Sequence, residues 1–163
     1  MAVKIHQLQI RVTAAEKAAI QRAAALAGLD MSQWALTRLL PAQPQRFREL
    51  TDALRNPAQR RYTLADLNDF LERLAADEFA EAVSDRLPDG LDAYVANYVA
   101  AMVETAAHRK SVTPPSWVEA IAPLDEPVFG TPIESLRLHL LTASPPAFRR
   151  RRIFIDATIG DRV

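Results

Sequence analysis

One stretch near the start of the chain alternates polar and apolar residues, and sequence typical of helices follows it at once. The alternation predicts a strand with two different faces, one with Gln7, Gln9 and Arg11 and the other with Leu8, Ile10 and Val12. A lone strand leaves its backbone N–H and C=O groups unpaired, and no second strand follows nearby. We therefore expect this strand to pair with the same strand of a second copy, which makes the chain a homodimer.

Two helices are predicted directly after the strand. Thr13 and Glu16 have the spacing of a capping box, and an apolar stripe runs on to Gly28, so the first helix is expected over residues 14–27. Asp30 is expected to begin a second helix, over residues 31–40. A module of about 40 residues cannot bury enough apolar surface alone. The side chains expected in a shared dimer core are Leu8, Ile10, Val12, Trp34, Leu36, Leu39 and Leu40.

The remainder of the chain is predicted to form a second, all-α domain. Pro41 and Pro44 indicate a linker, so the two domains are expected over residues 1–41 and 45–163. Apolar periodicity and caps predict helices over residues 46–55, 63–74, 77–87 and 91–109, with the last one central. The Pro-rich segment 113–132 is expected to be extended, followed by a helix over 133–141 and a β-prone run over 153–155. The predicted fold is mainly α, with a β-α-α module first.

The charges are distributed unevenly, although the net charge of the chain is zero. Residues 1–41 carry five Lys or Arg against two Asp or Glu, which gives +3 per chain. Residues 42–110 carry nine against twelve, and residues 111–163 carry six against six. A local basic excess at the N-terminal module is compatible with a nucleic-acid partner.

The residues of the module suit duplex DNA. A two-stranded ribbon fits the major groove, where Gln recognises adenine and Arg recognises guanine. Base contacts are therefore expected from Gln7, Gln9 and Arg11, and phosphate contacts from Lys4 and from the start of the second helix at Met31, Ser32 and Gln33. The alternative is a solvated edge strand followed by an ordinary N-cap.

A run of four arginines, Arg149, Arg150, Arg151 and Arg152, lies near the end of the chain. Guanidinium groups pair with phosphate and carboxylate, so the run is a candidate contact for nucleic acid or for an acidic partner. The alternative, which we favour, is that these arginines neutralise acidic helices between Asp66 and Asp92 of the same chain or its mate.

Several classes of function find no support in the sequence. The chain has no cysteine, which excludes disulfides and thiolate metal sites. His6, His108 and His139 lack metal-ligand spacing, and no nucleophile stands near a base. We expect no cofactor, no metal and no catalysis. The longest apolar segment is too short for a membrane span, so we expect no membrane partner and a cytoplasmic location.

Residues 9–17 and 23–34 together resemble the ribbon-helix-helix proteins found as bacterial antitoxins. The resemblance implies an obligate dimer with paired strands in the major groove of an operator. It also implies base contacts from Gln7, Gln9 and Arg11 and phosphate contacts from Met31, Ser32 and Gln33. An antitoxin of this kind represses its own operon and neutralises a protein toxin, here through the C-terminal domain. The long helical extension departs from the family, whose members are usually much shorter.

Two other functions remain open at this stage. One is a ribbon-helix-helix transcriptional regulator whose second domain senses a ligand or forms higher oligomers. The other is a helical scaffold or interaction protein that does not bind DNA and uses the strand only for dimerisation. Salt-sensitive DNA binding would separate the second from the rest.

Overall fold

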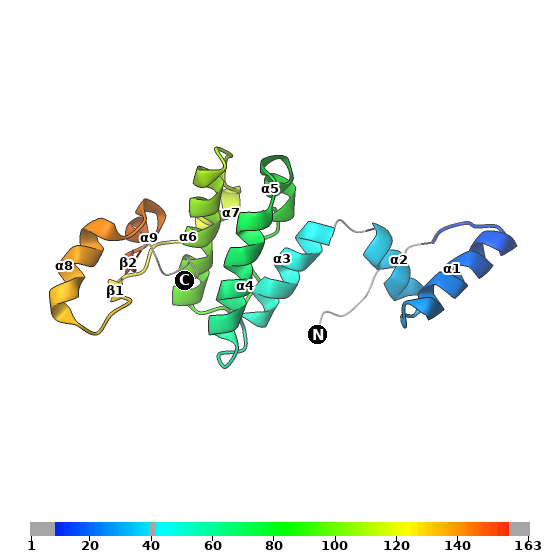
Figure 1. The fold of residues 1–163 in the computed structure, drawn as a ribbon, viewed down its shortest axis with the longest axis horizontal. Helices are drawn as coiled ribbons and strands as arrows, with labels where there is room; N and C mark the ends of the chain where they lie inside the picture. Colours follow the sequence, from blue (N-terminus) through cyan, green and yellow to red (C-terminus); the bar gives the residue numbers. More distant parts are fainter. Residues whose placement is uncertain (1–8, 40–41, 157–163) are drawn as a thin grey trace. The chain divides into compact units, whose positions relative to one another are not determined.

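The computed structural model describes residues 9–39 and 42–156 of the chain. The chain divides into two compact units, residues 1–41 (unit 1) and residues 42–163 (unit 2). The described residues of both units are mainly helical, and a small two-stranded sheet belongs to unit 2 (Figure 1).

The described part of unit 1, residues 9–39, contains two helices, α1 (Ala14–Leu26) and α2 (Met31–Leu39), which pack against each other. Thr13 begins α1 with the predicted capping box: its backbone N–H donates to Glu16 Oε2 at 2.7 Å, and the Glu16 N–H donates to Thr13 Oγ1 at 3.3 Å. The hydrogen bonds from the Thr13 backbone and hydroxyl lower the pKa of Glu16. Gly28 has a φ of +68°, which suits the turn between the helices. Both predicted helices are confirmed.

The predicted N-terminal strand is not shown by the structure. Its described part, residues 9–12, has no regular secondary structure, and residues 1–8 lie outside the described residues. A strand exists only when its backbone groups pair with a neighbouring edge, and the single chain provides no such edge among its described residues.

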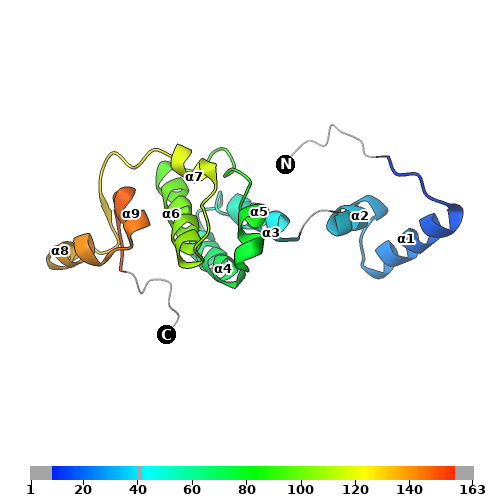
Figure 2. The ribbon, with the colours of Figure 1, turned by 90° about the horizontal axis from the view of Figure 1, so that it is seen from above.

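Unit 2 is built around the helix α6 (Ala93–Arg109), as the sequence predicted. Helix α4 (Arg60–Arg73) packs between α6 and α3 (Ala42–Ala53), and α5 (Ala76–Ala82) packs on α3 (Figures 1 and 2). The largest fully buried side chains of this core include Phe47, Phe79, Leu54, Leu67, Leu71, Val99 and Val103. Asp92 caps α6 by accepting from the Val95 N–H at 2.9 Å.

Three predicted helix boundaries in unit 2 were wrong. Helix α3 already begins at Ala42, because Pro44 falls in its first turn, where no backbone N–H is required. Thr63 lies inside α4 instead of capping it, and its hydroxyl donates to the Gln59 carbonyl oxygen at 3.1 Å. Helix α5 ends at Ala82, well before the predicted end at Leu87.

The C-terminal half of unit 2 is not wholly helical, so the all-α prediction was wrong there. Strands β1 (Val128–Phe129) and β2 (Ile153–Phe154) pair in parallel, with Val128 opposite Ile153. The Pro-rich segment is only partly extended, because it contains α7 (Ser116–Ala120) as well as β1. Helices α8 (Glu134–Ala143) and α9 (Pro146–Arg150) connect the strands, and α9 packs on α6.

Arg151 joins this C-terminal part to the central helix. Its side chain is buried, and its guanidinium donates to the carbonyl oxygens of Val118, at 2.7 Å, and Ile121, at 3.3 Å. It also donates to Asn97 Oδ1 at 3.3 Å and forms an ion pair with Glu104 at 3.7 Å. Arg151 thus connects the end of α9 to α6 and α7.

Replacing Glu104 should expose the dependence of unit 2 on this ion pair. Glu104→Ala leaves the buried Arg151 guanidinium without its counter-charge, so the free energy of unfolding should fall by about 3 kcal/mol. Urea unfolding in a Trp34→Phe background, where the buried Trp117 reports on unit 2, measures the change. Arg149→Ala, on the exposed neighbour, is the control and should change stability by less than about 0.5 kcal/mol. Equal losses for both variants would contradict this role of Glu104.

Candidate nucleic-acid interface

The described part of the predicted strand presents its side chains to solvent on both faces. Gln9 and Arg11, predicted to contact bases, are exposed. Ile10 and Val12, predicted to face a dimer core, are also exposed, by 58% and 42%. The remaining predicted strand residues, Lys4, Gln7 and Leu8, lie outside the described residues.

The apolar surface of unit 1 is largely uncovered in the single chain. Ala24 is the one buried side chain among its described residues. Large apolar side chains are exposed on or beside its helices: Leu26, Leu29, Met31, Leu36 and Leu39. Trp34 is half-buried, with the Arg38 guanidinium 5.7 Å from its ring centroid, and Leu40 is outside the described residues. An apolar surface of this kind marks a site of association.

The start of α2 presents the predicted phosphate-binding residues Met31, Ser32 and Gln33, all of them exposed. The first N–H groups of a helix have no acceptor within it and attract anions. Asp30 already occupies one of them, because its Oδ1 accepts from the Gln33 N–H at 2.9 Å. Met31 and Ser32 are therefore the better placed of the three residues for a phosphate contact through the backbone.

The four-arginine run serves several different roles in unit 2. Arg151 is buried, whereas Arg150 forms an ion pair with Glu104 and Arg152 donates to the Asp125 carbonyl oxygen. Arg149 is exposed on α9. Glu104 lies on the central helix, so it does not belong to the acidic helices predicted to neutralise the run.

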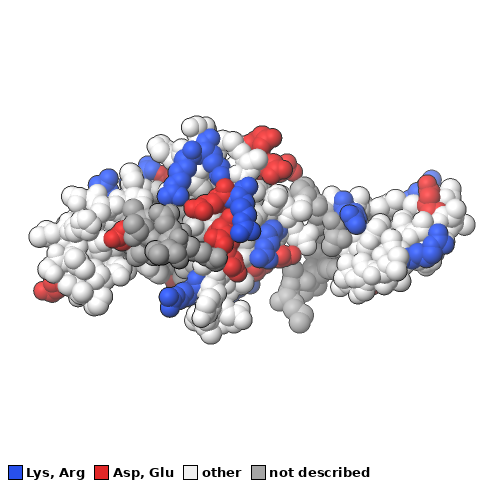
Figure 3. Space-filling view, viewed as in Figure 1, with Lys and Arg blue, Asp and Glu red and all other residues white. Residues whose placement is uncertain are grey.

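Unit 2 does not present a surface of one charge sign on the face visible in Figure 3, where Lys and Arg are interspersed with Asp and Glu. Ion pairs account for part of this mixture, including Arg60 with Asp92 at 2.6 Å and Arg109 with Glu72 at 3.5 Å. The part of the chain that the structure describes has no cluster of side chains suited to a metal ion. Nor does any described helix have the length and apolarity needed to cross a bilayer.

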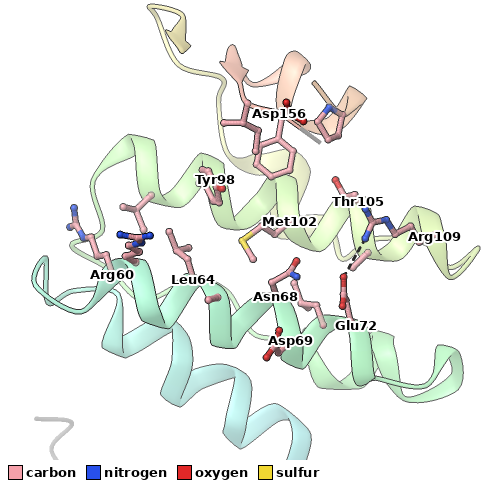
Figure 4. A pocket seen from close by; sticks show the side chains of 18 of the residues that line it. Arg60, Leu64, Asn68, Asp69, Glu72, Tyr98, Met102, Thr105, Arg109 and Asp156 are labelled. Carbon is pink, nitrogen blue, oxygen red and sulfur yellow. Dashed lines mark hydrogen bonds and ion pairs between the residues drawn. The ribbon is translucent and has the colours of Figure 1, made fainter. Parts of the chain in front are cut away.

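A groove lies between α4 and α6 in unit 2 (Figure 4). It has a volume of about 840 Å³, and Leu64, Tyr98 and Met102 are among its apolar lining residues. Burial raises the pKa of Tyr98 to about 12. Tyr94, Tyr98 and Met102 follow one another at one-turn spacing, which is typical of a packed core and less often of a small-ligand pocket. Only Met102 of the three is buried, and all three line the groove.

Residues 2–76 match the family model described as NikA-like, mobilization protein NikA. The matched segment comprises the whole ribbon-helix-helix candidate together with α3 and α4, and is slightly less than half of the chain. No curated protein and no solved structure matches the chain. The family match supports a DNA-binding protein with a ribbon-helix-helix module, and it does not support an antitoxin specifically.

The Asp30 cap should contribute to the stability of unit 1. Asp30→Ala removes the acceptor of the Gln33 N–H, so the free energy of unfolding should fall by about 1 kcal/mol. Asp30→Asn keeps an acceptor at the same place and should retain most of this stability. Urea unfolding in a Trp117→Phe background, where Trp34 reports on unit 1, at one fixed protein concentration distinguishes the two variants. If Asp30→Asn were as unstable as Asp30→Ala, the cap would not be the cause.

Proposed function

We propose that this chain is a homodimeric protein that binds duplex DNA in a sequence-specific manner as part of a mobilization system. The match of residues 2–76 to the NikA-like mobilization protein family is the observation that carries the proposal. The function is binding without catalysis. Unit 1 reads the DNA, and unit 2 provides surfaces for further association.

The exposed apolar surface of unit 1 supports the dimer. Ile10, Val12, Leu36 and Leu39 leave much of their surface in water in the single chain, and each buried CH₂ group contributes about 0.8 kcal/mol. Pairing of the two N-terminal segments would also satisfy their backbone N–H and C=O groups. Dimerisation would therefore bury the exposed apolar side chains and pair the free backbone groups at the same time. It would also put Gln9 and Arg11 on the outer face of a ribbon.

The charge and residue types of unit 1 support DNA as the ligand. A dimer brings two sets of the basic excess of residues 1–41 together, which gives +6. Arg11 suits the O6 and N7 acceptors of guanine, and Gln9 suits the edge of adenine. The exposed first turn of α2, with Met31 and Ser32, suits the flanking phosphates.

Mobilization is favoured over the two regulatory functions because the family match names it. Neutralisation of a toxin, implied by the antitoxin resemblance, has no corresponding observation in unit 2. A transcriptional regulator would use the same DNA-binding module. The position of the preferred DNA site therefore distinguishes mobilization from transcriptional control. A site at an origin of DNA transfer supports mobilization, and a site only in the promoter of its own gene supports a regulator.

Ile10→Asp should prevent dimerisation. Ile10 is exposed in the single chain, so a charge there costs little in the monomer but would be buried without a partner in the ribbon. Sedimentation equilibrium at micromolar concentration should give a dimer for the unmodified chain and a monomer for the variant. Gln21→Asp, at an exposed position of α1, is the matched control and should remain dimeric. A dimeric Ile10→Asp protein would exclude the ribbon as the dimer contact.

Arg11→Ala should weaken specific DNA binding. Loss of one bidentate guanine contact should cost about 1–3 kcal/mol of binding free energy. The probe is a duplex selected from a random DNA pool by the unmodified protein, and binding is measured by fluorescence anisotropy at fixed salt. Arg73→Ala, at an exposed arginine of α4, is the control and should bind as the unmodified chain does. Unchanged affinity for Arg11→Ala, or selection of no duplex at all, would refute the assigned base contact.

A further inference from the structure

Most of the large apolar side chains on and beside helix α8 of unit 2 are exposed to solvent in the single chain. Leu140 is buried, whereas Ile133, Leu136, Leu138 and Leu141 are exposed, Leu138 by 75%. Helix α8 contacts strand β2, which has only two residues. Exposed apolar side chains that gather on one element mark a surface for association.

The side of α8 that faces away from Leu140 has a definite pattern. Glu134, Leu138 and Leu141 occupy positions i, i+4 and i+7, which places them on one face of the helix. The Glu134 side chain is 87% exposed and is only loosely paired with Arg137, at 3.7 Å. This outward face, with two leucines beside one carboxylate, is available to a partner while Leu140 keeps its place.

The groove between α4 and α6 is complementary to this face of α8, because it offers an apolar lining and positive charge. Leu64, Tyr98 and Met102 give it an apolar lining, and the Arg60–Asp92 and Arg109–Glu72 ion pairs involve groove residues near its two ends (Figure 4). Arg61 also lines the groove, is exposed, and has no ion-pair partner among the residues that the structure describes.

We propose that the α4–α6 groove of one subunit binds the outward face of α8 from another copy of this chain. The groove is long enough: from Arg60 to Glu72 the wall formed by α4 is about 20 Å long, and α8 is about 15 Å long, at 1.5 Å per residue. Leu138 and Leu141 enter the apolar part of the groove, and Glu134 meets the unpaired Arg61. This is the helix-in-groove mode of recognition.

A second copy is the occupant because α8 is held by its own chain through its other face. Leu140 is buried, and the Ser144 hydroxyl at the end of α8 lies within hydrogen-bond distance of the Leu140 carbonyl oxygen, at 2.6 Å, and of the carbonyl oxygen of Ile155, the residue after β2, at 2.7 Å. Seating α8 in the groove of its own subunit would sacrifice these contacts. Docking between subunits keeps them and covers both exposed surfaces at once.

The absence of cysteine from the sequence allows a direct test in this chain. Two variants, Leu138→Cys and Ala65→Cys, are co-produced with different tags, purified together and oxidised mildly. Ala65 is exposed on α4 and lines the groove. We expect a disulfide that joins the two differently tagged chains, seen on a non-reducing gel. The control pair combines Ala65→Cys with Ala120→Cys, at an exposed position of α7, and should give little of this product.

A second substitution tests whether the linkage depends on the leucine face. Adding Leu141→Glu to the Leu138→Cys chain would bury a charge in the groove and should lower the yield of the mixed disulfide about tenfold, equivalent to about 1.4 kcal/mol of binding free energy. A yield no higher than that of the control pair would overturn the proposal. So would an undiminished yield with Leu141→Glu, or a disulfide formed only within one chain when both cysteines are placed in it.

These outcomes are independent of DNA binding. Leu138, Leu141 and Ala65 all belong to unit 2, outside the strand and helices that are proposed to read DNA. The same variants should therefore bind the selected duplex when DNA recognition by unit 1 is intact, whichever way the cross-linking experiment ends.

Discussion

Unit 1 cannot bury its own apolar side chains, and the functional interpretation follows from this constraint. Ala24 is the one buried side chain among its described residues, whereas Ile10, Leu36 and Leu39 remain exposed. The helices are nevertheless well specified locally, by the Thr13 capping box and the Asp30 cap. Local signals thus fix the helices, and the proposed dimer would cover the exposed side chains, because an identical segment can satisfy the unpaired backbone groups of the N-terminal segment.

Unit 2 has the opposite character, because it has a large core of its own and uses one buried cation to organise its periphery. Arg151 donates to carbonyl oxygens in α7 and at its C-terminal end and pairs with Glu104 on α6, which fixes α9 and the small sheet against the central helix. Phe148 and Ile155, on either side of Arg151 in the sequence, also line the groove. The ion pair that stabilises this part of the fold therefore also positions part of the groove wall.

The features predicted correctly from the sequence are those determined by local residue patterns. The helices α1 and α2 were recognisable because caps at Thr13 and Asp30 mark where they begin, and α6 was recognisable from the regular apolar spacing within its segment. The pairing of Val128 with Ile153 was not, since 25 residues separate them and each strand has only two residues. The groove was foreseen only as a minor alternative for the same reason: its lining comes from α4, α6 and the segment after α8, and a periodic pattern describes only one segment at a time.

The two association surfaces differ in symmetry, and that difference has consequences for assembly. Pairing of identical strands is isologous and is complete in a dimer. The proposed binding of α8 into the groove would join two different surfaces, so it would close by reciprocal exchange of helices or as a ring, and would otherwise continue from dimer to dimer. Neighbouring sites on one DNA molecule would raise the effective concentration of such dimers far above that in solution. A weak contact through Leu138 and Leu141 would then act mainly among DNA-bound dimers, which links the occupancy of adjacent sites without altering how each site is read.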